Sequence, residues 1–173
     1  MKRWQAILPL AALVGLGILG GVQLMRPAEE SFTAKADRIA PDRSFPLLDD
    51  ANQSISFDPP PDDQPVMVNL FASWCAPCRA EHGDITRLAE THPGQVYGLA
   101  YKDDPEATRG FLAELGNPFE QIGVDRDGQG GLDFGLTGVP ETFVISPEGR
   151  IILHVRGPLD AERARQVSAA LEG

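Results

Sequence analysis

Two cysteines separated by two residues constrain the fold of this chain more than any other feature. Cys75 and Cys78 are the only cysteines among 173 residues, which excludes a scaffold held by several disulfides and a four-cysteine zinc site. They follow the apolar run Val66–Ala72, which is typical of a strand buried on both faces. The helical pattern of residues 76–91 comes next. The pair is therefore predicted to lie where a buried strand ends and a helix begins.

This position gives the two thiols different chemistry. Unpaired N–H groups and the helix dipole at a helix N-terminus favour an anion, so the pKa of Cys75 is expected below the value of about 8.5 for a free thiol. Pro77 suits the first helical turn because it has no N–H to leave unpaired. Cys78 lies one turn deeper on the same face. We predict a redox-active disulfide in which Cys75 is the nucleophile and Cys78 resolves the mixed disulfide.

Two other interpretations of the cysteine pair stay open. A purely structural disulfide would add little stability, because the loop that it closes is very short. A metal site could use the C-x2-C-x3-H spacing of Cys75, Cys78 and His82, with His154 as a fourth ligand. His82 and His154 stand alone in the sequence, however, and neither belongs to a metal-binding motif.

The first thirty residues differ from the rest of the chain. Ala6–Val22 carries no charge, and with its flanks it is long enough to cross a bilayer core of about 30 Å. An uncleaved anchor is preferred over a cleaved signal peptide or a buried soluble helix, because Val22–Met25 is a poor cleavage site. Lys2 and Arg3 precede the span, so the N-terminus is expected in the cytoplasm and the rest outside it. The predicted parts are a cytoplasmic stub (1–4), a transmembrane anchor (5–25) and a tether (26–40).

The charge is concentrated in the part that is predicted to be exported. The whole chain has a net charge of -10, but residues 1–30 hold three bases and two acids, whereas residues 31–173 hold twelve bases and 23 acids. No basic surface is available to displace phosphate counterions, which argues against a nucleic-acid partner. The exported part should be soluble and weakly repelled by an anionic bilayer.

Residues 41–173 are predicted to form one α/β domain. A first hairpin is expected around Asp49–Asn52, and a second around Pro147–Arg150. Alternating strand and helix patterns, then a hairpin and a last helix, are typical of one compact layered structure. Besides 66–72 and 76–91, the expected strands are Phe45–Leu48, Ser54–Phe57, Val96–Tyr101, Gln121–Val124, Thr142–Ser146 and Ile151–Arg156, and the expected helices are Glu106–Leu115 and Asp160–Leu171.

Pro140 enters one of these strands. X–Pro bonds are the ones for which the cis form costs little, about 0.5–1 kcal/mol, so a cis peptide and an ordinary strand-entry proline are both open from spacing alone. A proline here withholds an N–H and leaves neighbouring backbone groups free to pair with an extended substrate segment.

These motifs identify a family resemblance over roughly residues 41–173. The chain resembles the thioredoxin-like thiol:disulfide proteins of cytochrome c maturation (the CcmG or DsbE family), although Gly83 and Phe71 stand where relatives often have proline and tryptophan. The matching segments are Ser73–His82, Tyr101–Asp103, Gly116–Phe119, Gly130–Gly135, Gly138–Phe143 and Gly157–Leu159.

The resemblance implies a thioredoxin-like fold with an added N-terminal hairpin at about Phe45–Phe57, preceded by a single transmembrane helix. It implies a monomeric periplasmic domain, anchored in the inner membrane, that keeps the haem-binding cysteines of apocytochrome c, or a CcmH-type thiol partner, reduced. Electrons would come from a membrane reductase of the DsbD or CcdA type. No nucleotide, flavin or haem motif is present, so no cofactor and no metal are expected. Alternatives are a general extracytoplasmic reductant or oxidant and an anchored metal-binding module.

The resemblance also assigns residues around the cysteines. It implies that Pro140 is the cis-proline, that Trp74 is part of the active-site motif, and that Glu81 and Glu141 lie by the active site. A carboxylate near the cysteines opposes thiolate formation and can carry its proton. Two solvent-exposed glutamates without a role are the alternative.

Overall fold

The computed structural model describes residues 33–61 and 63–173. The predicted stub, the predicted transmembrane anchor and the first part of the predicted tether lie outside the described residues. Within the described ranges, no helix is long and apolar enough to cross a membrane.

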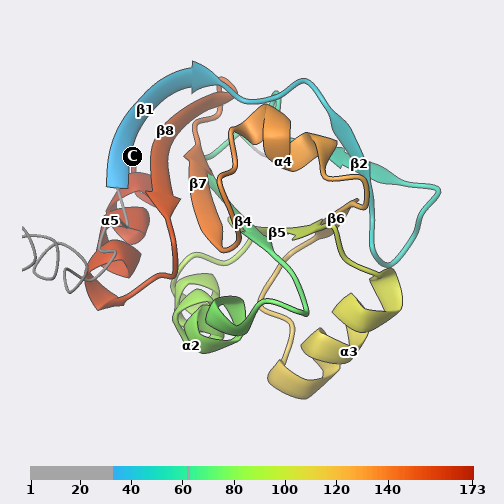
Figure 1. Cartoon of the computed structure of the whole chain (residues 1–173). Helices are drawn as coiled ribbons and strands as arrows, with labels where there is room; N and C mark the ends of the chain where they lie inside the picture. Colours follow the sequence, from blue (N-terminus) through green and yellow to red (C-terminus); the bar gives the residue numbers. More distant parts are fainter. Residues whose placement is uncertain (1–32, 62) are drawn as a thin grey trace, which may run out of the picture. The chain divides into compact units, whose positions relative to one another are not determined.

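A six-stranded sheet in the order β1-β8-β7-β4-β5-β6 forms the centre of the domain (Figure 1). β4 pairs in parallel with β5, and β5 with β6, whereas the β4–β7, β7–β8 and β8–β1 pairs are antiparallel. The strands are β1 (Thr33–Ile39), β4 (Val66–Phe71), β5 (Val96–Tyr101), β6 (Ile122–Asp125), β7 (Glu141–Ile145) and β8 (Arg150–Arg156). β4 is central and all its residues are buried, as its apolar sequence predicts.

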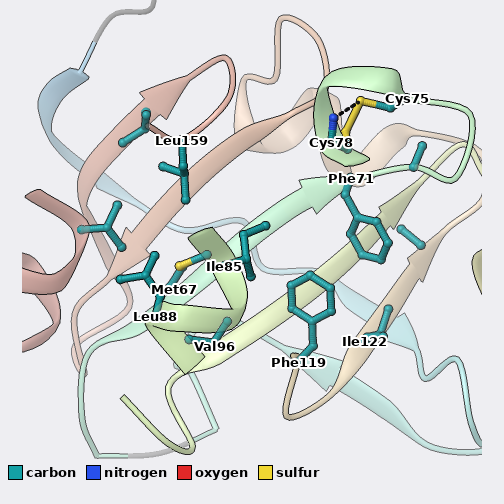
Figure 2. Packing of buried hydrophobic residues seen from close by; sticks show 14 of the residues in the cluster. Met67, Phe71, Cys75, Cys78, Ile85, Leu88, Val96, Phe119, Ile122 and Leu159 are labelled. Atoms are coloured by element: carbon teal, nitrogen blue, oxygen red, sulfur yellow. Dashed lines mark hydrogen bonds between the residues drawn. A yellow bond between two sulfur atoms is a disulfide. The ribbon is translucent and has the colours of Figure 1, made fainter. Parts of the chain in front are cut away.

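Two hydrophobic cores cover the two faces of the sheet. The first joins the sheet to three helices: α2 (Ala76–Thr91), α3 (Pro105–Leu115) and α5 (Ala161–Leu171). Figure 2 shows this core, in which Met67 of β4 and Ile85 of α2 lie below the cysteine pair. The second core joins the other face to α4 (Gln129–Phe134) and to a small hairpin of β2 (Ser44–Pro46) and β3 (Ser54–Ser56).

Most predicted elements are confirmed. The bounds of β4 to β8, α2, α3 and α5 agree with the expected ranges to within one residue at each end. The expected N-terminal hairpin is present, with Phe45 paired to Ile55 and both side chains buried in the second core. Its packing depends on Gly123 of β6, because a Cβ there would lie 2.8 Å from the Cβ of Phe45.

Two elements differ from the prediction. The segment 26–40 was expected to be a tether, yet Thr33–Ile39 form β1, so the folded domain begins before residue 41. Its sequence is polar, and it becomes a strand because it completes the free edge of β8. The short helix α4 was not predicted. It lies between Gly128 and Gly135, which both have positive φ, and the Asp125 carboxylate accepts hydrogen bonds from two backbone N–H groups in its first turn.

Candidate active site

Cys75 and Cys78 form a disulfide at the point where β4 leads into α2 (Figure 2). Cys75 is the N-cap residue of α2, and its Sγ accepts a hydrogen bond of 3.1 Å from the backbone N–H of Cys78. Pro77 occupies the first turn, as predicted. Both cysteines are buried in the disulfide form: Cys75 is 4% exposed and Cys78 is 1% exposed. A thiolate on Cys75 would occupy the position that the helix N-terminus stabilises.

A buried carboxylate in the family-like segment Tyr101–Asp103, which received no predicted role, holds the loop before the cysteines. Asp103, two residues after the end of β5, accepts hydrogen bonds from the backbone N–H (2.7 Å) and hydroxyl (2.8 Å) of Ser73. It also accepts bonds from the Thr108 hydroxyl (2.9 Å) and the Asp104 N–H (3.0 Å) at the start of α3. The sequence carries a signal for this contact. Ser73 follows β4 and Asp103 follows β5, and the carboxyl ends of neighbouring parallel strands meet at one sheet edge.

Trp74 lies beside the disulfide with its ring largely in solvent. The side chain is 60% exposed, and its indole N–H donates a hydrogen bond of 3.2 Å to the carbonyl of Lys102. Lys102 has a positive φ of 46°, in the left-handed region. The bond fixes the indole while a large aromatic surface stays open next to Cys75.

Glu81 lies one helical turn after Cys78 and is 2% exposed. Its Oε1 accepts a hydrogen bond from the Asn69 side-chain amide (3.0 Å) and its Oε2 accepts one from the Leu159 N–H (2.6 Å). Burial raises the pKa of Glu81 to about 7, against the opposing effect of these two hydrogen bonds. Glu81 is thus not an exposed helix glutamate, and its carboxyl group can gain or lose a proton near neutral pH.

β7 begins at Glu141, directly after Pro140. The Val139–Pro140 peptide bond is cis, and Val139 packs against the core cluster that contains both cysteines. The Glu141 side chain is buried, and its pKa lies below its usual value. Burial alone would raise this pKa, but the hydrogen bonds from His154 and Thr137 together lower it by more.

The two glutamates lie on opposite faces of the sheet. Thr142, the residue after Glu141, accepts a hydrogen bond of 3.1 Å from Asn69, which also binds Glu81. Because successive side chains of a strand point to opposite faces, Glu141 points away from Glu81 and into the second core. The family resemblance placed both carboxylates by the active site, but their surroundings differ.

The four residues of the metal hypothesis do not come together. His82 Nε2 lies 3.1 Å from the carbonyl oxygen of Gly116, and His154 Nε2 lies 2.7 Å from Glu141. In the part of the chain that the structure describes, no group of three or more histidine, cysteine, aspartate or glutamate side chains has the geometry to hold a metal ion.

Comparisons with known proteins identify the family of this chain. The Redoxin family model matches residues 34–171. The thiol:disulfide interchange protein DsbE of Allochromatium vinosum is 36% identical over 159 residues, covering 91% of this chain and 87% of that protein. HelX of Rhodobacter capsulatus, also a thiol:disulfide interchange protein, is 46% identical over 93 residues, about half of each chain (54% and 52%).

A solved structure shares the fold. The thiol:disulfide interchange protein of the thioredoxin family from Chlorobium tepidum matches with a TM-score of 0.62 at 24% identity, covering 80% of this chain and 98% of that one. The thioredoxin-like α/β fold of this chain is therefore shared with that structure, and its sequence is related to thiol:disulfide interchange proteins. The chain belongs to the redoxin family, within it to the DsbE-type thiol:disulfide interchange proteins, and is a thiol:disulfide oxidoreductase.

Proposed function

We propose that this chain is a reductant of cytochrome c maturation that is anchored in the inner membrane and works in the periplasm. Its client would be the haem-binding cysteine pair of apocytochrome c or a CcmH-type thiol partner, and its electron donor a membrane reductase of the DsbD or CcdA type. The family membership, the apolar N-terminal segment and the acidic domain that follows it support this proposal. The observation that carries the chemistry is the position of Cys75 as N-cap of α2.

The reduced pair supplies two electrons and two protons to a client disulfide. The Cys75 thiolate attacks one client sulfur, a mixed disulfide forms, and the other client sulfur leaves as a thiolate that takes up a proton. The Cys78 thiol then loses its proton and attacks Cys75 Sγ, which releases the second client thiol and forms the Cys75–Cys78 disulfide. Glu81, with a pKa of about 7, is the base suited to receive the Cys78 proton at neutral pH.

The test in the native host is the amount of mature c-type cytochrome. Cys75→Ser and Cys78→Ser should each abolish it, and His92→Ala, a change at a histidine near the opposite end of α2, should not. Normal holocytochrome in both cysteine variants, without added thiol, would show that the proposal is wrong. The reduction potential separates the direction of electron flow: a value near that of thioredoxin, about -270 mV, supports a reductant, and one near that of DsbA, about -120 mV, supports an oxidant.

The order of attack has its own test. Cys78→Ser should accumulate mixed disulfides through Cys75, because the nucleophile remains and the resolving thiol is gone. Cys75→Ser should accumulate few, since Cys78 is the more deeply buried sulfur. Non-reducing electrophoresis of acid-quenched cells measures both, and equal trapping by the two variants would contradict the assigned roles.

A further inference from the structure

The segment Thr137–Glu141, which packs through Val139 against the core cluster that contains the disulfide, presents free backbone. Within residues 33–61 and 63–173, the N–H and carbonyl groups of Gly138 and Val139 make no hydrogen bond. Gly138 is exposed, and Val139 packs against the cluster that includes Cys75 and Cys78. An extended client chain that brings its disulfide to Cys75 can therefore pair with this segment.

The Glu141 carboxylate holds this segment closed. Its Oε1 accepts hydrogen bonds from the backbone N–H (3.0 Å) and the hydroxyl of Thr137, four residues earlier. These bonds join the two ends of the segment. The conformation of the free backbone between them thus depends on where the carboxylate is held.

His154 of β8 fixes the other oxygen of that carboxylate. Its Nε2 lies 2.7 Å from Glu141 Oε2, and because a carboxylate only accepts, the Nε2–H is the donor. The imidazole is 6% exposed and stacked on the buried ring of Phe143, with centroids 4.1 Å apart and planes 22° apart. A flat ring held on this surface cannot swing away, so it holds the carboxylate in place.

The hydrogen bonds from His154 and Thr137 lower the pKa of Glu141 and so keep it in the ionised form that accepts these bonds. The Arg38 guanidinium of β1 lies 5.8 Å from the centre of the Phe143 ring, and its charge acts on Glu141. Arg156 of β8 is the cross-strand partner of Glu141. Glu141, with its lowered pKa, thus differs from Glu81, whose raised pKa suits it to proton transfer.

We propose that His154 is a positioning residue for client binding: by holding the Glu141 carboxylate, it fixes the Thr137–Glu141 segment in the conformation that pairs with an extended client beside the disulfide. This rests on the proposed function in one respect, namely that the client is a peptide disulfide. His154 touches neither the reacting sulfurs nor the client, and its effect is on binding rather than on the exchange step.

The experiment follows single turnovers of the purified, reduced full-length chain with an excess of one of two substrates, so that the half-saturating concentration gives the KM and the limiting rate gives the kcat. One is an oxidised peptide with a Cys-x-x-Cys-His disulfide, and the other is 5,5′-dithiobis(2-nitrobenzoate), which has no peptide backbone. His154→Leu removes the donor and should raise the KM for the peptide about tenfold, the expected loss for one hydrogen bond to a charged group. The kcat for the peptide and the rate with the small disulfide should stay within about twofold, the expectation when only ground-state binding is lost. His154→Gln keeps an N–H donor and should restore most of the affinity.

His92 provides the matched control. It is similarly buried (7% exposed) and its Nε2 lies 2.7 Å from the Ser168 hydroxyl, near the C-terminal end of α2. His92→Leu and His92→Gln should leave the KM for the peptide unchanged. If His154→Leu does not fold, Thr137→Val tests the same contact from the exposed end of the segment by removing the hydroxyl donor to Glu141. It should raise the KM for the peptide several-fold, roughly the loss of one hydrogen bond.

Each result has one meaning. Equal losses with both substrates, no recovery in His154→Gln, or an unchanged KM in Thr137→Val would overturn the positioning role. A wild-type protein that saturates with the peptide, together with a His154→Leu variant of unchanged KM, would refute this inference alone. A wild-type protein whose reduction of the peptide does not saturate would refute the proposed client class, and the positioning role with it; the absolute rates with the two substrates are not compared, because the aromatic disulfide has the better leaving group.

Discussion

Replacing Glu81 by glutamine should make the oxidised protein more stable at alkaline pH, because the wild-type fold holds a carboxylate where a neutral group is preferred. Burial raises the pKa of Glu81 from 4.5 to about 7. A raised pKa in a carboxyl group means that the protonated form is favoured in the fold. Below pH 4.5 the Glu81 carboxyl group is protonated in both the folded and the unfolded chain, so it does not lower the free energy of unfolding. Between pH 4.5 and 7 the unfolded chain ionises first, so the stability of the wild type falls as the pH rises.

The size of the effect follows from that pKa. The displacement from 4.5 to about 7 corresponds to about 3 kcal/mol when both states are ionised, of which roughly 2–3 kcal/mol falls between pH 5 and pH 8. Glutamine removes this pH-dependent cost. It also leaves one of the donors, Asn69 Nδ2 or the Leu159 N–H, facing an amide nitrogen, which costs about 1 kcal/mol at every pH. The difference between the two pH values therefore isolates the ionisation.

The assay is urea unfolding of the purified oxidised protein at pH 5 and pH 8. The free energy of unfolding of Glu81→Gln, relative to the wild type, should rise by roughly 2–3 kcal/mol between the two conditions. Glu120→Gln, a change at an exposed carboxylate outside the site, should show the wild-type dependence on pH. If Glu81→Gln and the wild type lose stability in parallel from pH 5 to pH 8, the carboxyl group of Glu81 is not the titrating group that we infer.

Three further changes test the packing and the loop of the site. Gly131→Ala would place a Cβ 2.5 Å from the Tyr101 ring and should cost about 1–3 kcal/mol of unfolding free energy; an unchanged urea midpoint would contradict the close packing of α4. Gly110 of α3 has open space around its Cβ position, so Gly110→Ala should instead raise the free energy of unfolding by about 0.5–1 kcal/mol. A lower melting temperature of this variant would contradict that expectation. Asp103→Asn should cost about 1–3 kcal/mol and accelerate hydrogen exchange at the Ser73 amide, since the new amide nitrogen must face a donor; unaltered exchange would show that another group holds the loop.

The elements with strong local signals were predictable from the sequence. Val66–Phe71 is apolar throughout because the strand is covered on both faces, and α2 begins where a proline enters a helical pattern. β1 lacked such a signal, since its polar residues become a strand by pairing with β8, more than a hundred positions away. α4 is six residues long and contains two glycines, so local propensity argued against a helix that the Asp125 carboxylate caps from outside.

The residues of the site also include some that the sequence predicts and others whose surroundings depend on distant elements. The cysteines, Trp74 and Pro140 lie in contiguous motifs, so their placement could be predicted. The environments of Glu81 and Glu141 could not, because Leu159 and His154 reach them from other elements. The register of the β7–β8 hairpin, which sets Phe143 opposite His154, decides that Glu141 meets a histidine.

The position of β1 has a practical consequence for anyone who shortens this protein. A soluble version that began at residue 41, where the sequence pattern alone would start the domain, would lack the strand that covers β8. The backbone N–H and carbonyl groups of β8 would then form a bare sheet edge, which is a template for pairing with a second copy. It would also lose Arg38 and its contact with the carbonyl of Phe134 at the end of α4. A truncation that keeps residue 33 onward leaves β8 covered by β1, whereas one made eight residues later invites aggregation.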